Sequence, residues 1–369
     1  MKMLGFGLMR LPRIDPDDNN RIDMEASRQM IDRYMEAGFT YFDTAYFYHG
    51  GNSEPLFGEL IGSRYPRESY VVTSKMPLLL IKSAEDYPRI FEEQLKRCKV
   101  DYFDNYLLHC VGKKYLEDIN QMKGFEFIAQ KKAEGKIKNI GFSYHDDAET
   151  LDQILTEHPE VEIVQIQLNY IDWDSESIQS RKCYEVCRKH GVQIAVMEPL
   201  KGGSLAKLPP EAEKLMKDYA PDASIASWGI RYAASLEDVF IVLSGMSDMA
   251  QLEDNMAFMA DFKPLCDEER EILDKVIKIV HDSAAIPCTA CRYCIEKCPQ
   301  SIPIPECFSI YNNAKSFKLL PGMINTFDNF VRGKGKPSDC IECGQCEDAC
   351  PQHIKIIDSL KLVAADFEK

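Results

Sequence analysis

Short apolar runs alternate with longer amphipathic segments along residues 3–262 of the chain. The apolar runs have the length of buried strands, and the amphipathic segments have the 3.6-residue spacing of helices. Three of the helical segments stop at Gly38, Gly135 and Gly191, and glycine is favoured just after a helix C-terminus. The pattern predicts strands at residues 3–9, 39–43, 70–74, 103–109, 137–143, 161–168, 192–197 and 239–243, and helices at 24–37, 53–61, 83–98, 123–134, 147–157, 178–190, 225–234 and 249–260.

Strands and helices therefore pair eight times in a segment of the size of a (β/α)₈ TIM barrel. A doubly wound open sheet is the alternative, but it uses fewer repeats and a Gly-rich turn between its first strand and first helix. Here Gly5 and Gly7 lie inside the first expected strand. The α/β pattern thus favours the barrel.

The remainder of the chain has a different organisation. A short linker precedes an amphipathic helix at 267–281, and another helix is expected at 305–317. We expect three parts: a barrel at 1–262, a linker and helix at 263–287, and a small, helix-rich domain at 288–369.

Composition excludes several classes of protein. The 369 residues carry a formal net charge of −15, which disfavours binding to nucleic acid or anionic lipid. No apolar run is long enough to span a membrane, and no secretion signal is visible, so we expect a cytoplasmic protein. Fourteen cysteines in such a chain argue against a disulfide framework.

Polar residues stand at the ends of consecutive expected strands. Asp43 ends the second strand, Lys75 follows the third, His109 ends the fourth and Ser143 ends the fifth, while Tyr48 lies in the loop after Asp43. Catalytic residues of TIM barrels come from these strand ends. A structural ion pair between Asp43 and Lys75 and a core histidine are the alternatives, but the set together indicates an active site.

These residues carry a resemblance to the aldo-keto reductase family that covers about residues 3–262. The matching motifs are Asp43-Thr44-Ala45 with Tyr48, Gly51-Asn52-Ser53-Glu54, Thr73-Ser74-Lys75, Leu107-Leu108-His109, Gly141-Phe142-Ser143, Glu198-Pro199-Leu200, and Gln251-Leu252 with Asn255.

The resemblance implies a catalytic tetrad for carbonyl chemistry. Tyr48 would donate a proton to the substrate oxygen, although a free tyrosine, with a pKa of about 10, is a weak acid. Lys75 would lower that pKa, and Asp43 would hold Lys75 by a charged hydrogen bond. His109 would orient the carbonyl or alcohol substrate.

The resemblance also implies a nicotinamide dinucleotide. Its contacts would be Ser143, Gln165, Met197, Pro199, Leu200, Gly202, Gly203, Gly245, Gln251 and Asn255. Family members that select NADPH use basic residues after the last strand, whereas this chain has no Lys or Arg between Tyr232 and Lys263. We therefore expect NADH to be favoured among NAD(P)H cofactors. A flavin in the same phosphate site is the alternative, because barrels bind phosphate after strands seven and eight.

Eight cysteines near the C-terminus form two runs with the same spacing, C-x₂-C-x₂-C-x₃-C-P. The runs are Cys288, Cys291, Cys294, Cys298 and Cys340, Cys343, Cys346, Cys350. This spacing is typical of bacterial ferredoxins with two [4Fe-4S] clusters, in which the fourth cysteine of each run ligates the other cluster. We therefore assign Cys350 to the first cluster and Cys298 to the second. Zinc is the alternative, but it does not explain the third cysteine of each run.

Three functional hypotheses combine these parts. In the first, the barrel is a nicotinamide-dependent carbonyl oxidoreductase, and the clusters exchange electrons with a ferredoxin or flavoprotein partner. In the second, the protein transfers electrons or senses redox state, and the barrel docks a partner. In the third, the barrel carries a flavin that couples to the clusters. The tetrad favours the first hypothesis.

Overall fold

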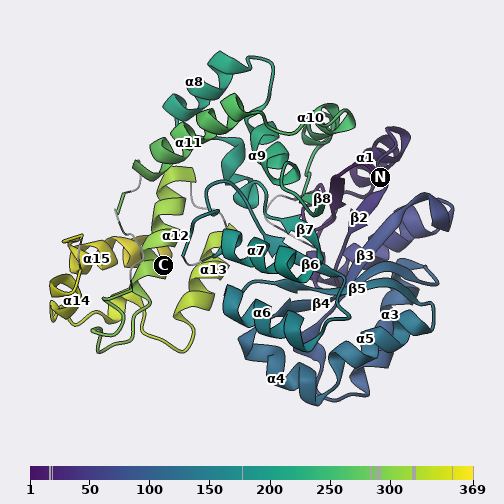
Figure 1. The fold of residues 1–369 in the computed structure, drawn as a ribbon, viewed down its shortest axis with the longest axis horizontal. Coiled ribbons are helices and arrows are strands. Elements are labelled where there is room, and N and C mark those ends of the chain that lie inside the picture. Colours follow the sequence, from purple (N-terminus) through teal and green to yellow (C-terminus); the bar gives the residue numbers. More distant parts are fainter. Residues whose placement is uncertain are drawn as a thin grey trace. The chain divides into compact units, whose positions relative to one another are not determined.

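The computed structural model describes residues 1–15, 18, 20–176, 178–282, 285–286, 288, 292–317, 321–350 and 352–368. Its strands form one closed parallel barrel in sequence order, and helices lie outside them (Figure 1). The strands are β1 Leu4–Gly7, β2 Tyr41–Asp43, β3 Val71–Met76, β4 Phe103–Val111, β5 Ile137–Tyr144, β6 Ile163–Gln167, β7 Gln193–Met197 and β8 Val239–Ser244. The (β/α)₈ prediction is confirmed.

The helices of the first 265 residues alternate with these strands. They are α1 Met24–Glu36, α2 Ser53–Phe57, α3 Asp86–Cys98, α4 Lys113–Gln121, α5 Gly124–Ala133, α6 Ala148–Glu157, α7 Ser180–His190, α8 Pro210–Tyr219, α9 Ile225–Ala234 and α10 Met249–Ala260. Asp23, Asp147 and Asp248 cap α1, α6 and α10, each accepting a backbone N–H of the first turn. α3 begins three residues later than the predicted helix at 83–98, and its N-cap residue is Glu85.

The register of the parallel strands brings their C-terminal ends together at one end of the barrel. β1 pairs with both β2 and β8, so Phe6 lies opposite Phe42 on one side and Ser244 on the other. A small apolar cluster fills the inside of the barrel, with Tyr41, Leu107, Ile163, Ala195, Ile241 and Leu243 as its buried members. The larger core lies between the strands and the surrounding helices, as expected for this fold.

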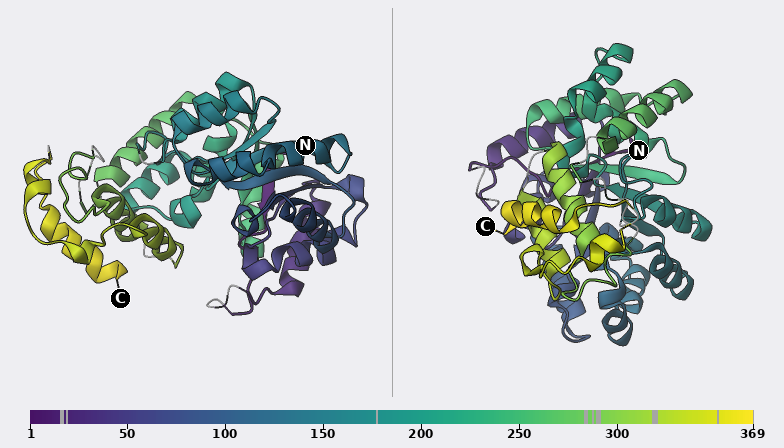
Figure 2. Two further views of the ribbon diagram at one scale, coloured as in Figure 1. Left: turned by 90° about the horizontal axis from the view of Figure 1, so that it is seen from below. Right: turned by 90° about the vertical axis from the view of Figure 1, so that its left-hand side faces the viewer.

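The chain divides into two compact units. Met1–Leu200 and Ala226–Leu265 form the barrel unit, while Lys201–Ile225 and Cys266–Lys369 form the second. The later helices are α11 Asp267–Asp282, α12 Ile304–Phe317, α13 Pro321–Val331, α14 Gln345–Asp348 and α15 Ile356–Phe367. The described part of the C-terminal region, yellow-green to yellow in Figure 2, consists of helices and loops, as predicted.

Apolar side chains hold the C-terminal helices together. Phe308 and Tyr311 of α12, Phe327 of α13, and Leu360 and Val363 of α15 belong to one buried cluster. Cysteines of both runs pack in the same cluster, so the core of this region is built around its thiols. Among the described residues, no helix is long and apolar enough to cross a membrane.

Candidate active site

Lys75 lies at the centre of the residues that the strand ends bring together. Its side chain is fully buried, and its Nζ donates hydrogen bonds to Asp43 Oδ1 at 2.7 Å and to the carbonyl oxygen of Thr44 at 2.9 Å. β3 continues to Met76, so Lys75 is part of the strand and does not follow it as predicted. A buried ammonium requires such partners, because an unpaired one would be strongly destabilising.

Tyr48 completes this arrangement from the loop after β2. It begins the short helix η1 Tyr48–Gly51, and its hydroxyl oxygen accepts a hydrogen bond from Lys75 Nζ at 3.3 Å. The ammonium also lies 5.0 Å from the centre of the Tyr48 ring. Because Lys75 donates to the phenol oxygen, the phenol proton stays free for another acceptor.

His109 faces Tyr48 from β4. The two rings meet edge to face, with their centres 6.1 Å apart. β4 extends beyond His109 to Val111, and its register with β5 shifts between Leu108 and Val111. Cys110 lies within this shifted stretch and has a left-handed φ of 60°. Such a bulge re-aims the neighbouring side chain, here His109, within a strand.

Electrostatics at the site differ from the expectation in one respect. Burial raises the pKa of Tyr48, and the Lys75 ammonium opposes only part of this effect. Burial acts to lower the pKa of Lys75, but the charges of Asp43 and Tyr48 raise it overall. Burial, the charge of Lys75 and that of His145 lower the pKa of His109 to about 3. At neutral pH the phenol is therefore protonated and the imidazole uncharged.

His145 and Cys110 belong to the same neighbourhood, although the sequence did not single them out. Burial and the Lys75 ammonium lower the pKa of His145 to about 4. Cys110 donates its backbone N–H to Ser143 Oγ at 2.8 Å. His145 lies one residue beyond the C-terminal end of β5, so its position in the strand pattern was the signal that could have revealed it.

Ser143 and Gln165 lie side by side on β5 and β6. The Gln165 side chain is buried, and its Oε1 has no hydrogen-bond partner in the described part of the chain. Buried amide oxygens are normally satisfied, so this atom fits a site that a ligand completes. The Ser143 hydroxyl accepts the N–H of Cys110 and retains its own proton as a donor. An amide-bearing ring such as nicotinamide matches this pair of groups.

Other expected cofactor residues follow β7. Met197 ends β7, and Pro199 and Leu200 follow it in the barrel unit. Gly202 and Gly203 lie in the short helix η5 Lys201–Ala206 of the second unit, with φ angles of 69° and 99°. These left-handed angles favour glycine at both positions.

Hydrogen bonds connect the residues after β8 to one another. Asn255 donates its side-chain amide to Ser244 Oγ at 2.9 Å. Gln251 Oε1 accepts the backbone N–H of Ser247 at 2.9 Å, and Asp248 accepts the backbone N–H of Gln251 at 2.8 Å. Gly245 lies between β8 and this group of side chains.

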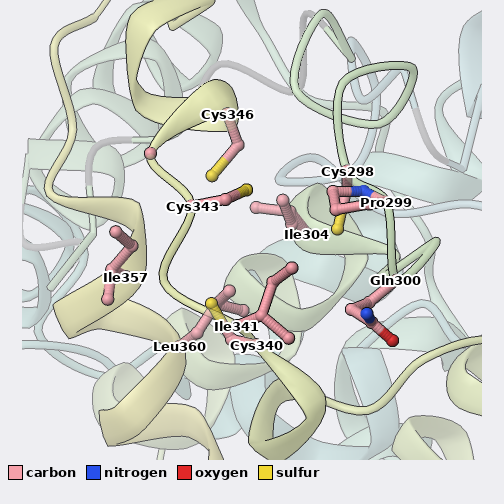
Figure 3. Close-up of a pocket in the computed structure, with 11 residues that line it drawn as sticks. Cys298, Pro299, Gln300, Ile304, Cys340, Ile341, Cys343, Cys346, Ile357 and Leu360 are labelled. Atoms are coloured by element: carbon pink, nitrogen blue, oxygen red, sulfur yellow. The ribbon is translucent and has the colours of Figure 1, made fainter.

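A cavity in the second unit brings together cysteines from both runs. It is lined by Cys298 of the first run and by Cys340, Cys343 and Cys346 of the second. Their sulfur atoms point toward the space between them, with Ile304 in the middle of the view (Figure 3). Aliphatic side chains such as Ile357 and Leu360 form the remaining wall.

In a second cavity, most of the cysteines come from the first run. Cys288 and Cys294 of the first run line it together with Cys350 of the second. Cys291, the remaining expected ligand, lies outside the described residues. No three His, Cys, Asp or Glu side chains of the described chain converge closely enough to hold one metal ion. Thiols spread around a cavity fit a cluster better than a single zinc ion, which needs ligands about 2.3 Å away.

Both parts of the chain match known protein families. Residues 3–278 match the aldo/keto reductase family, and residues 287–354 match the 4Fe-4S dicluster domain. The chain is 26% identical over 218 residues to the NADH-specific methylglyoxal reductase of Escherichia coli, covering 53% of this chain and 62% of that protein. It is 26% identical over 262 residues to the L-galactose dehydrogenase of Arabidopsis thaliana, covering 66% and 80%.

Solved structures share the barrel. An aldo-keto reductase of Bacillus halodurans in its holo form aligns with a TM-score of 0.60 at 23% identity, over 74% of this chain and 91% of that one. An aldo/keto reductase of Klebsiella pneumoniae in complex with NADP and acetate aligns with a TM-score of 0.58 at 22% identity, over 74% and 91%. Because the family match spans well over half of the residues, the chain belongs to the aldo/keto reductase family and carries a 4Fe-4S dicluster domain in its C-terminal part.

Proposed function

We propose that the barrel reduces or forms a carbonyl by hydride transfer with a nicotinamide cofactor, and that Tyr48 supplies the proton. The observation that carries this proposal is the buried Lys75 ammonium, which contacts Asp43, the Thr44 carbonyl and the Tyr48 hydroxyl at once. A nicotinamide ring, when bound, supplies the hydride, and residues of this chain hold and donate the proton.

The roles of the four residues follow from their contacts. Tyr48 donates its proton to the substrate oxygen, and Lys75 stabilises the phenolate that remains. Asp43 keeps Lys75 charged and in place. His109, uncharged at neutral pH, donates an N–H hydrogen bond to the same substrate oxygen and orients it.

We further propose that the cofactor amide lies against Ser143 and Gln165 and that NADH is favoured over NADPH. The unpartnered Gln165 oxygen supports the first assignment. The absence of Lys and Arg between Tyr232 and Lys263, and the NADH specificity of the similar Escherichia coli enzyme, support the second. A ratio of kcat/KM that favours NADPH over NADH would contradict the preference.

The domain at 288–369 would hold two [4Fe-4S] clusters and exchange electrons with a separate redox partner, after a barrel at 1–262 and a linker and helix at 263–287. Cys288, Cys291, Cys294 and Cys350 are the proposed ligands of one cluster, and Cys298, Cys340, Cys343 and Cys346 those of the other. Two cavities that each take cysteines from both runs support this crossed assignment. Reduced thiols and iron–sulfur clusters agree with a cytoplasmic location.

Tyr48→Phe tests the central step. The variant removes the proton donor and keeps the ring, so carbonyl-dependent NADH oxidation should fall by roughly 10²- to 10⁴-fold. The dissociation constant of NADH, measured by its fluorescence, should stay unchanged. A variant that retains full activity would show that Tyr48 is not the acid.

An anaerobic absorbance spectrum recorded before and after addition of NADH separates the first hypothesis from the third. No change in the cluster bands without a partner is expected. Bleaching by NADH alone, or a flavin band in the purified protein, would favour a barrel that carries flavin and couples to the clusters directly.

A further inference from the structure

Arg10 lies beside the segment after β8, although it is distant from that segment in sequence. It follows β1 by three residues. β1 closes the barrel against β8, with Phe6 opposite Ser244, so the loops after these two strands are neighbours. A search for basic residues along the sequence after β8 therefore misses a cation that barrel closure brings there.

Gly245 provides the space for the Arg10 side chain. A Cβ atom at Gly245 would lie 2.9 Å from Arg10 Cδ and 3.0 Å from Arg10 Cβ and Cγ. Gly245 does not have a positive φ, so its backbone conformation does not require glycine. The lack of a side chain is what admits the arginine stem. Ser247 Oγ also donates a hydrogen bond to the Arg10 carbonyl oxygen at 2.8 Å, which fixes the two loops together.

The Arg10 guanidinium has no ion pair or side-chain hydrogen bond with any residue that the structure describes, and the side chain is exposed. Two neighbouring backbone donors are already used: Ser247 N–H is bonded to Gln251, and Gln251 N–H to Asp248. The Asp248 carboxylate adds a negative charge at the start of α10. Arg10 is thus placed to supply the positive charge that this segment of the sequence lacks.

We propose that Arg10 binds the diphosphate of the nicotinamide dinucleotide, an inference that rests on the function proposed above. Barrels bind phosphate at the loops after strands seven and eight, and Arg10 lies against the second of these. An arginine fork matches phosphate oxygens geometrically. The diphosphate is common to NADH and NADPH, whereas the Asp248 carboxylate disfavours a further phosphate dianion at α10.

Arg10→Gln in the full-length, anaerobically purified protein tests this inference. Loss of a charged hydrogen bond should raise the dissociation constants of NADH and NADPH alike by roughly ten- to a hundred-fold. The salt dependence of binding should weaken as well, because one ionic contact is lost. Arg10→Lys keeps the charge and should recover part of the affinity. Arg13→Gln, which changes another exposed arginine of the same loop, is the matched control and should bind as wild type.

The possible outcomes separate this inference from the proposed function. Wild-type affinity in Arg10→Gln would overturn the role of Arg10 and leave the dinucleotide site intact. A loss confined to NADPH would place Arg10 at the 2′-phosphate and overturn the diphosphate assignment. A wild-type protein that binds FMN but neither dinucleotide would overturn both the inference and the proposed function.

Discussion

At the scale of single residues, Lys75 joins structure and chemistry. Its ammonium is buried and is stable there because Asp43 and the Thr44 carbonyl accept its protons. Removing one partner of such a buried pair costs about 3–5 kcal/mol, since the other charge is left without compensation. Asp43 and Lys75 can therefore form a structural ion pair and also have the proposed catalytic role.

The charge states of Tyr48 and His109 predict the pH dependence of reduction. Burial raises the pKa of Tyr48 above its usual value of about 10, and reduction consumes the phenol proton, so activity is lost as pH rises through that pKa. His109 has a pKa lowered to about 3 and stays uncharged above it. The rate of carbonyl reduction at saturating cofactor should be level from roughly pH 5 to pH 9 and fall above about pH 10.

Oxidation of the alcohol should show the opposite trend and rise with pH, because it requires the phenolate. A reduction rate that already falls between pH 6 and pH 8 would mean that Lys75, and not burial, dominates the pKa of Tyr48. His109→Gln should keep the alkaline decline, because that decline belongs to Tyr48.

Residues close in sequence to a strand end were predictable, and those brought together by closure of the barrel were not. Asp43, Tyr48, Lys75 and His109 could be identified because each marks an expected strand end or its loop. The position of Arg10 depends on the pairing of the first strand with the last, which no local pattern reveals. The net direction of the Tyr48 pKa depends on burial, a property of the folded site.

At the scale of elements, the bulge in β4 sets the positions of two consecutive residues, His109 and Cys110. Cys110 adopts a left-handed φ, and its N–H is bonded to Ser143 Oγ of the next strand. This hydrogen bond ties a proposed cofactor residue to the residue that follows the proposed substrate-orienting histidine. The bulge therefore links the two parts of the proposed site.

Substitutions at Cys110 should report on this bulge. Cys110→Gly relieves the left-handed conformation and should retain activity, whereas Cys110→Val places a β-branched residue there and should destabilise the barrel by roughly 1–2 kcal/mol. Thermal unfolding and kcat measure the two effects. Cys266→Val, at an exposed cysteine that starts no bulge, controls for loss of a thiol. Equal behaviour of the Gly and Val variants at Cys110 would argue against a strained bulge.

Strands and most barrel helices could be predicted from periodicity, because their apolar faces repeat regularly. The helices α4, α8, α13, α14 and α15 were not identified. α4 and α8 are additional helices outside the regular strand–helix alternation. α13 and α15 form their apolar faces against α12, so their positions depend on tertiary packing in the C-terminal region.

At the scale of the whole molecule, two units of different architecture share one chain, and the C-terminal part of the second unit has cysteines in its core. Its core combines aliphatic and aromatic side chains with cysteines of both runs. The repeated spacing was sufficient to predict a domain with two clusters, since few other sites use it. The arrangement of loops and helices between the two runs could not be predicted from this spacing.

Pairs of cysteine substitutions distinguish crossed ligation from ligation within each run. Cys298→Ala and Cys340→Ala should each lower the iron content from about eight to about four atoms per chain, and the double variant should lose no more, because both residues serve one cluster. Cys298→Ala combined with Cys294→Ala should lose both clusters. Iron analysis and electron paramagnetic resonance of the reduced protein measure these contents. The reverse pattern would indicate that each run binds its own cluster.

Ile304, the first residue of α12, lines both cysteine cavities. One branched aliphatic side chain thus contributes to the lining of both thiol sets. Across a single apolar side chain, a charge on one cluster would be felt at the other with little screening. A second electron would therefore meet the repulsion of the first, and the loaded domain would fill in two distinguishable steps. Its redox titration should behave as that of one coupled pair, with the side chain at position 304 setting the strength of the coupling.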